Sequence, residues 1–459
     1  LRQAGLQVSF APEDNFLFLP DYTPAMQRAG IETLYAPYVR SVREHLAQHG
    51  ERYDLVLVIR PGVAERHLRE LRRRCARARI LYLAADLHFL RLQRECELAG
   101  AAATGDAAAE MQRKELAIMR AVDGVIVHSL AERELLAGEH GLEAVHVFRW
   151  AMPVPGTASG FAARRDIAFV GGYRHGPNVD AVQYFVDAVF PLVRARLPGV
   201  RFLAIGSDPP QALRDLASES VVVTGYVEDL APLLDGVRVA VAPLRFGAGI
   251  KGKIATTLGA GLPCVASSIA VEGMGLADGD EVLVADDPAN FAERVAALYS
   301  DEALWERLSG NGLAFARRNF GAAAAEDSLR CILDAVGFAL PPGPFARVLF
   351  SPMAKPPAPA GAVLRPRVLV PAAVLRDETD FGSALPGAFL QAPDPAPDGG
   401  GAEEFTVEGY CVPCGRTVPF MVDMRSGGRC EDGRWIPNWR ESLHCPQCGM
   451  NNRQRLMAS

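Results

Sequence analysis

The sequence predicts an α/β protein with two parallel-sheet domains and a small cysteine-rich unit at its end. Short apolar runs alternate with longer helical patterns through the first 335 residues, and a Pro- and Gly-containing break at 152–160 divides them into two halves. Five of the nine cysteines crowd into the last fifty residues. A chain of 459 residues also exceeds what one hydrophobic core usually serves, so about three units are expected.

The apolar runs indicate strands that are buried on both faces, because they are continuous rather than alternating. With helices between them, they favour two Rossmann-like domains, which we place at 1–153 and 154–338. The predicted strands are 53–60, 78–85, 124–129, 166–172, 201–207, 221–226, 237–243, 262–268 and 281–287.

The chain opens at Leu1 with LRQAGLQVSFAPED, which is typical of a helix end that runs into a second strand. We therefore expect that the first strand and its Gly-rich loop are missing. Such a fragment should be weakly active or inactive, although its second domain should still bind a nucleotide. The opening has no secretion-signal pattern, and no run of 18 apolar residues is present. A cytoplasmic location is expected, with peripheral contact at the inner membrane as an alternative.

Composition indicates a globular protein, with 49% hydrophobic and 22% charged residues. The formal net charge of −6 provides no overall basic field, so no nucleic acid partner is expected.

The first strand of the second domain ends in FVGGYRHGPNVDAV. Gly171 and Gly172 would let the backbone approach a ligand, and a helix expected to begin near Asn178 would point its N-terminus at the same crevice. Arg174 lies in this loop, where ligands bind in open α/β sheets. It is interpreted as a phosphate contact, with a solvated loop arginine as the alternative.

A second loop, PLRFGAGIKGKI, places glycines around Lys251 and Lys253 just before a helix. Gly249 and Ile250 belong to the same turn. This pattern predicts an anion nest with two ammonium groups. The alternative is a pair of surface lysines at a helix start, where their charge would oppose the helix dipole.

Through about residues 1–335 the chain resembles the family-4 retaining glycosyltransferases, which have the GT-B fold with two domains facing a cleft. The resemblance rests on the order and spacing of FVGGYRHGPNVDAV, VTGYVEDLAPLL, VAPLRFGAGIKGKI, GLPCVASSIAVEGMG and DEALWERLSGNGLAF.

The resemblance implies roles for individual residues. Arg174 and Lys253 would neutralise the donor diphosphate. Asp86 or His88, after a strand of the first domain, would face the transferred sugar, although a lone histidine is more often packed or solvated. The residues expected against the nucleobase are Gly225, Tyr226 and Val227.

The resemblance also implies the reaction. A sugar would pass from a nucleotide-diphosphate donor, UDP- or GDP-linked, to a glycan or lipid-linked acceptor, with retained configuration and without a metal. Negative charge would build up on the departing diphosphate, where fixed cations and a helix N-terminus can stabilise it.

The sequence departs from the family at two positions. Many members carry two glutamates that contact donor hydroxyls, and the matching residues here are Ala248 and Thr256. Donor identity is therefore left open. Glu272 is the nearest carboxylate that could substitute, or it could satisfy local backbone amides.

The segment 339–402 is rich in Pro, Ala and Gly and is predicted to be a linker, with its apolar middle, VLRPRVLVPAAVL, docked on a neighbour. Residues 403–459 contain two CxxC pairs, which predict a structural zinc ribbon, with disulfides as the alternative. Cys430 is expected to be a spare thiol and His444 a neighbour of the site. The expected zinc ligands are Cys411, Cys414, Cys445 and Cys448.

The ribbon resembles those that precede a methyltransferase domain in some cell-surface-polysaccharide proteins, so a further covalent domain beyond this chain is expected. Two functions remain open. The leading one is an active glycosyltransferase, favoured by Arg174 and the Lys251-x-Lys253 loop. The alternative is a catalytically degenerate scaffold that binds a nucleotide or glycan within a larger protein, favoured by Ala248, Thr256 and the missing first strand.

Overall fold

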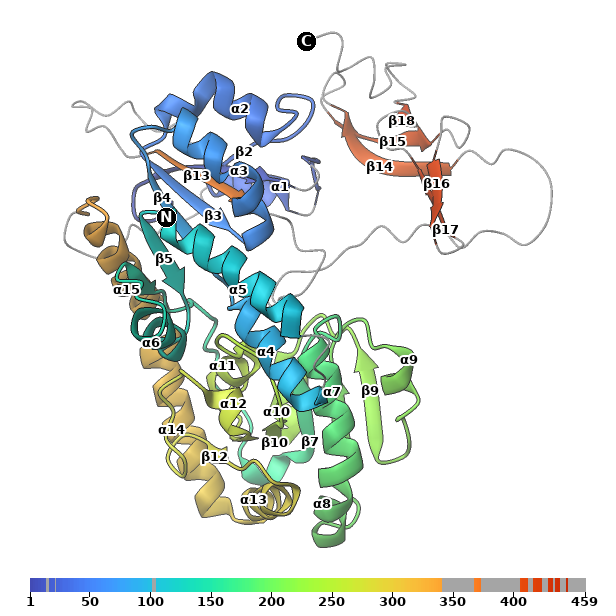
Figure 1. Ribbon diagram of the computed structural model, residues 1–459. Coiled ribbons are helices and arrows are strands. Elements are labelled where there is room, and N and C mark those ends of the chain that lie inside the picture. The colour runs from blue at the N-terminus through green and yellow to red at the C-terminus, as the bar shows by residue number, and fades with distance from the viewer. Residues whose placement is uncertain are drawn as a thin grey trace.

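The computed structural model describes residues 1–13, 16–20, 22–100 and 105–340, together with six later strands, β13 to β18 (Figure 1). Within 405–444 the structure describes the backbone of strands β14 to β18 and no side chains. The chain forms two parallel-sheet α/β domains, as predicted, and the expected strands are present but shorter, down to the two residues Leu283–Val284 where 281–287 was expected.

The N-terminal domain has a seven-stranded parallel sheet in the order β2-β1-β13-β3-β4-β5-β6. Its strands are β1 (Gln7–Pro12), β2 (Glu32–Thr33), β3 (Leu55–Ile59), β4 (Arg79–Leu83), β5 (Gly124–Val127), β6 (Val145–Val147) and β13 (Arg367–Ala372). Its helices are α1 (Thr23–Arg28), α2 (Val42–His49), α3 (Pro61–Arg74), α4 (His88–Ala99), α5 (Gly105–Arg120) and α6 (Leu130–Gly138).

Strand β13 corrects the expectation that this sheet lacks its first strand. It comes from the segment that we predicted to be a linker, and it lies between β1 and β3, where the first strand of a Rossmann-like sheet belongs. Its Leu369 packs into the core on one face of the sheet, and Val368 and Val370 pack into the core on the other. A continuous apolar run that fills both buried faces explains why this short segment docks so far from its neighbours in sequence.

The C-terminal domain has a six-stranded parallel sheet in the order β12-β11-β10-β7-β8-β9. Its strands are β7 (Arg165–Val170), β8 (Phe202–Ile205), β9 (Val221–Gly225), β10 (Val237–Ala242), β11 (Cys264–Ala266) and β12 (Leu283–Val284). Its helices are α7 (Gly176–Tyr184), α8 (Phe190–Arg196), α9 (Gln211–Arg214), α10 (Ala231–Gly236), α11 (Gly252–Gly259), α12 (Ser268–Val271), α13 (Pro288–Ser300) and α14 (Glu302–Phe320).

Helix α15 (Ala322–Ala335) returns the chain from the second domain to the first (Figure 1). Its Ile332 and Leu333 are buried against Leu55 and Leu81 of the N-terminal sheet. The last helix therefore fastens the two domains together. In the part of the chain that the structure describes, no helix is long and apolar enough to cross a membrane.

The strand order of the second domain defines where a ligand can enter. From β7 the chain runs outward to β8 and β9, then returns to β10 on the other side of β7. The connection after β7 runs toward β8, and the connection after β10 runs toward β11 on the opposite side. The loops at the carboxyl ends of these two strands therefore diverge and leave a crevice. Both loops selected from the sequence lie at this switch point.

The cysteine-rich segment contributes β14 (Phe405–Cys411), β15 (Arg416–Val422) and β18 (Leu443–His444) to one antiparallel sheet, and β16 (Gly428–Glu431) pairs with β17 (Arg434–Pro437). Cys411 ends β14 and Cys430 lies in β16. Cys414, Cys445 and Cys448 lie outside the described residues, as do all side chains of this segment. The zinc site therefore stays a prediction.

Candidate functional site

A cavity of about 50 Å³ lies where the two domains meet. The N-terminal domain contributes Asp86, which follows β4, and Trp150. The C-terminal domain contributes the loops after β7 and β10. From these loops the lining residues are His175, Pro177, Asn178, Leu244, Phe246, Gly247, Ala248, Ile250, Lys251, Gly252 and Lys253.

Lys253, in the first turn of α11, is held inside this site. Its side chain is only 8% exposed, and its Nζ donates to Asn178 Oδ1 at 2.9 Å. Asn178 in turn donates from Nδ2 to the carbonyl of Gly172 at 2.7 Å. One chain of hydrogen bonds thus ties the loop after β7 to the helix after β10. The alternative of a surface lysine is wrong for this residue.

The loop after β7 depends on glycine for its close approach to neighbouring chain. A Cβ atom on Gly171 would lie 2.8 Å from Asn178 Nδ2, and one on Gly206 would lie 1.8 Å from the carbonyl oxygen of Gly171. Arg174 does not line the cavity; its Nε lies 3.1 Å from Asp208 Oδ2, and both side chains are about half exposed. The two cations expected on the diphosphate are therefore placed differently, one buried in the site and one outside the cavity.

Lys251 is also buried, but it faces the other domain. Its Nζ donates to the carbonyl of Gly249 at 2.7 Å, and burial lowers the pKa of Lys251 to about 8 against the opposing effect of Glu132 and Glu272. Glu132, at the start of α6, accepts the N–H of Leu87 at 3.1 Å and also a backbone hydrogen bond from Gly249. Burial, reinforced by Asp86, raises the pKa of Glu132 to about 8.

Asp86 and His88 lie together, as the sequence indicated. His88 Nε2 lies 3.3 Å from Asp86 Oδ1, and Arg91 Nε donates to Asp86 Oδ2 at 3.3 Å. Burial alone would raise the pKa of Asp86, but these cationic neighbours outweigh it and lower it. For His88, burial acts to lower the pKa, and the contact with Asp86 more than reverses that effect. Only Asp86 of the two lines the cavity.

Glu272 pairs with the N-terminal domain rather than with local backbone amides. Arg94 of α4 holds both carboxylate oxygens at 2.7 Å, and the same guanidinium donates to the carbonyl of Gly247 at 2.7 Å. Burial acts to raise the pKa of Glu272, but Arg94 outweighs it and lowers the pKa. The loop after β10 is therefore clamped from across the domain boundary.

The remaining predicted residues lie at or near this loop and at β9. Gly225 ends β9 with a φ of 71°, Tyr226 is 48% exposed and Val227 packs against the domain core. Thr256 is half-buried on α11 and does not line the cavity. Ala248 does line it. Among the described residues no cluster of His, Cys, Asp and Glu could hold a metal ion.

Sequence reasoning missed several residues that shape the site. Glu115 of α5 is fully buried and accepts the backbone N–H groups of His88 and Phe89 at 3.3 and 2.9 Å, so it caps α4. Burial raises the pKa of Glu115 to about 7. Glu115, Arg94 and Glu132 carry no local signal in the sequence, because each lies on an ordinary amphipathic helix of the N-terminal domain. Only Asn178 carried a local signal, its place at the end of the Gly-Gly loop.

Two parallel α/β domains that enclose such a site define the protein as GT-B-like. Residues 164–301, which contain both loops, match the family described as glycosyl transferases group 1. A protein described as an uncharacterized 44.6 kDa protein in the cps region of Klebsiella pneumoniae is 21% identical over 164 residues, which cover 34% of this chain and 42% of that protein. The chain therefore spans about two fifths of the length of the curated relative that it matches.

Solved structures show the same fold at low sequence identity. Sucrose-phosphate synthase from Thermosynechococcus elongatus has a TM-score of 0.54 at 17% identity, covering 72% of this chain and 88% of the other. Anabaena HepE, in a complex with UDP-glucose, has a TM-score of 0.53 at 12% identity, covering 72% and 100%. These likenesses extend through both large domains and establish the fold.

Proposed function

We propose that this chain is a glycosyltransferase that transfers a sugar from a nucleotide-diphosphate donor to a glycan acceptor with retention of configuration. One observation carries the proposal. The part of the chain that matches glycosyl transferases group 1 contains the buried Lys253–Asn178–Gly172 connection at the switch point of the second sheet. That is where an open α/β sheet binds a ligand.

The proposed chemistry follows from the charges around the cavity. Breaking the glycosyl–phosphate bond leaves negative charge on the diphosphate, and the ammonium of Lys253 is already fixed at the N-terminus of α11. The acceptor hydroxyl would attack from the face that the nucleotide leaves, and a phosphate oxygen would take its proton. Asp86 and His88 would orient the transferred sugar from the other domain. No metal is required in this scheme.

The nucleobase would lie against Gly225, Tyr226 and Val227, where the half-exposed Tyr226 ring can stack. UDP is favoured over GDP because HepE was solved with UDP-glucose and TarM from S. aureus with UDP. The acceptor is proposed to be a glycan or a lipid-linked glycan, and the location cytoplasmic, with peripheral contact at the inner membrane as the alternative.

The test is a thermal-shift screen of nucleotide sugars on this chain, followed by product analysis with the best donor in the presence of EDTA. We expect stabilisation by UDP-sugars and a product with the anomeric configuration of the donor. Inverted product or a requirement for added metal would contradict the mechanism. No stabilisation by any nucleoside diphosphate would contradict the donor site.

The second candidate is a scaffold that binds a nucleotide or glycan without turnover. It is favoured by Ala248 and Thr256 in place of carboxylates, and by Arg94, which engages Glu272. Both candidates predict nucleotide binding. A donor that is bound but neither transferred nor hydrolysed would support the scaffold.

A further inference from the structure

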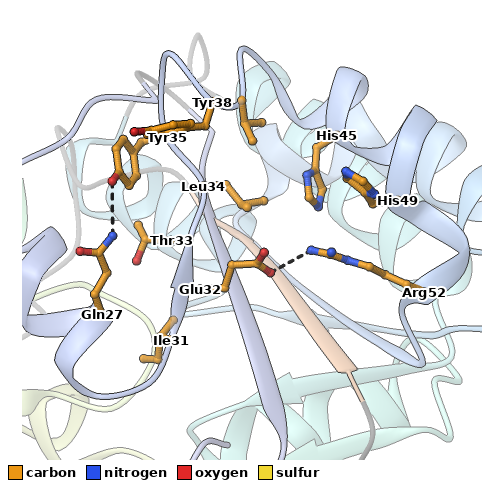
Figure 2. Close-up of a pocket in the computed structure, with 11 residues that line it drawn as sticks. Gln27, Ile31, Glu32, Thr33, Leu34, Tyr35, Tyr38, His45, His49 and Arg52 are labelled. Atoms are coloured by element: carbon orange, nitrogen blue, oxygen red, sulfur yellow. Dashed lines mark hydrogen bonds and ion pairs between the residues drawn. The ribbon is translucent and has the colours of Figure 1, made fainter. Parts of the chain in front are cut away.

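A second and larger cavity lies at the outer edge of the N-terminal sheet, with a volume of about 310 Å³ (Figure 2). It lies between β2 with the loop that follows it and helix α2. Its volume is at the lower end of the range of small-molecule sites. None of the residues assigned to the donor site lines it.

One wall of the cavity is aromatic. Tyr35 and Tyr38 meet edge to face, with ring centroids 5.6 Å apart, and Phe18 supports Tyr35 from behind at 5.3 Å. Tyr38 is 63% exposed, so a large ring stands open to solvent at this wall. Gln27 donates to the Tyr35 hydroxyl at 3.5 Å, so amide and phenol groups line the rim (Figure 2).

The opposite wall is polar but electrically balanced. Arg52 donates to Glu32 at 2.8 Å, and His45 shares a hydrogen bond of 2.6 Å with the Tyr53 hydroxyl. Burial, with the nearby Arg52, lowers the pKa of His45 to about 4, so this imidazole is neutral at neutral pH. Glu32 and Arg52 cancel each other in charge. Such a wall offers hydrogen bonds without a net charge to attract a phosphate or a carboxylate.

Two buried polar atoms on lining residues lack a partner. Thr33 Oγ1 and Arg52 Nε have no hydrogen bond among the described residues. A buried polar group without a partner costs about 1–3 kcal/mol, so native proteins usually satisfy it. Both atoms are shielded from solvent, so they mark strain in this wall rather than contacts that the cavity offers to a ligand.

The cavity also lies on the side of the sheet where an acceptor would extend. Tyr35 and Tyr38 follow β2, and Asp86 follows β4, so the two loops lie at the carboxyl edge of the same parallel sheet. β2 is four strand positions from β4, roughly 19 Å at about 4.8 Å per strand. The transferred sugar at Asp86 cannot reach across that separation, but a remote sugar unit of an acceptor glycan can.

We propose that the cavity formed by Tyr35, Tyr38, Thr33 and Arg52 binds a neutral sugar residue of the acceptor glycan, away from the donor site. The inference rests on the proposed glycosyltransferase function. A sugar ring presents C–H groups to the electron-rich face of Tyr38 and hydroxyls to the polar wall. Together these explain the exposed ring and the balanced charges.

The test is saturation-transfer NMR on this chain with the methyl glycosides of glucose, galactose and mannose and with neutral disaccharides. We expect millimolar affinity for at least one of these ligands, with saturation passing to the face of the sugar ring. Tyr38→Ala should weaken it by about 3- to 10-fold. Leu192→Ala, which shortens another exposed side chain on the C-terminal domain, is the matched control. Added UDP should not displace the saccharide.

The outcomes separate this inference from the proposed function. Saccharide binding that depends on Tyr38 in a chain that transfers no sugar supports the cavity and contradicts the transferase. If the chain transfers sugar, binds none of the saccharides and keeps its acceptor KM in Tyr38→Ala, the proposed role of the cavity is overturned and the transferase proposal stands. Displacement by UDP, or binding of an extended peptide to the edge of β2 in place of saccharides, also overturns it.

Discussion

Replacing Lys253 by methionine is the sharpest test of the donor site. The substitution keeps the length and apolar stem of the side chain and removes only the ammonium group that donates to Asn178 Oδ1 at 2.9 Å. Because this ammonium is 8% exposed and already held in place, it can respond to charge that develops on a departing diphosphate without reorganising.

The expected effect on rate is larger than the effect on binding. Loss of a fixed donor to a developing anion costs about 2–4 kcal/mol in the transition state, roughly 30- to 1000-fold in kcat. The ground-state diphosphate is already charged but more weakly held, so donor affinity should fall by less than about tenfold.

Stability should change in the direction opposite to that for a surface lysine. Lys253→Met leaves Asn178 Oδ1 without this donor, at a cost of about 1–3 kcal/mol, and relieves an unfavourable charge at the start of α11 worth about 0.3–1 kcal/mol. The net loss of roughly 1–2 kcal/mol corresponds to a fall in Tm of about 2–8 °C. A surface lysine at a helix start would instead give a slightly higher Tm and unchanged turnover.

The assay measures donor consumption, by transfer and by hydrolysis, with donor binding and Tm for each variant. Lys114→Met is the matched control, because Lys114 lies on α5 and pairs with Glu65 at a part-exposed site. Lys251→Met should have the milder effect on kcat, since Lys251 faces Glu132 in the other domain. Unchanged kcat in Lys253→Met, with donor affinity lowered or not, would refute the assigned role.

Four further predictions concern other contacts and motifs of the chain. Arg94→Met should release the loop after β10 and raise the donor KM by about 5- to 30-fold. The control is Arg113→Met on the neighbouring helix α5. An unchanged KM would show that the contact of Arg94 with Glu272 and Gly247 has no role in donor binding. Glu132→Gln should leave Tm unchanged near pH 5 and raise it relative to the parent near pH 8. A carboxyl whose pKa is raised in the folded state contributes stability at low pH, and this stability is lost as the pH rises through about 8. Parallel Tm profiles of the two proteins would contradict this. A chain that ends at residue 340 should lose hydrogen-exchange protection in β1 and β3 but not in β7 and β10. The reason is that the three buried side chains of β13 contribute roughly 5–9 kcal/mol to the stability of the first sheet. Equal protection in the two chains would argue against the docked strand. Elemental analysis should find about one zinc per chain, and its removal should unfold 403–459 alone; protein purified without chelator that contains no zinc would end the ribbon interpretation.

The two large domains could be predicted because continuous apolar runs alternate with helical patterns, which is typical of parallel sheets covered on both faces. Strand β2 has two residues and β6 has three, and segments so short carry no periodicity of their own. β13 lies in the segment that we predicted to be a linker with a docked apolar middle, because its flanks are rich in proline; its place inside the sheet was not predicted. Its partner β1 lies more than three hundred residues away in sequence, and no local pattern reports such a pairing.

The loops that we propose for the donor could be recognised in the sequence for a different reason. A glycine-rich turn between a strand and a helix is local in sequence, so Gly171, Gly249 and Lys253 were recognisable without a structure. The carboxylates that fix these loops are not local. Glu132 and Glu115 read as the polar faces of ordinary helices, and only the folded chain shows that each caps the turn after β4.

The clamp from Arg94 bears on the missing carboxylates of the donor site. Ala248 lines the cavity where the family resemblance implies an acidic side chain, so a donor hydroxyl there needs an acceptor from another element. Glu272 follows α12, and Arg94 holds both of its oxygens and the carbonyl of Gly247 together. A carboxylate oxygen has two lone pairs, so Glu272 can accept from a sugar hydroxyl without leaving Arg94. The N-terminal domain would then orient the group that reads the donor, and the two domains would have to be joined before a donor is recognised.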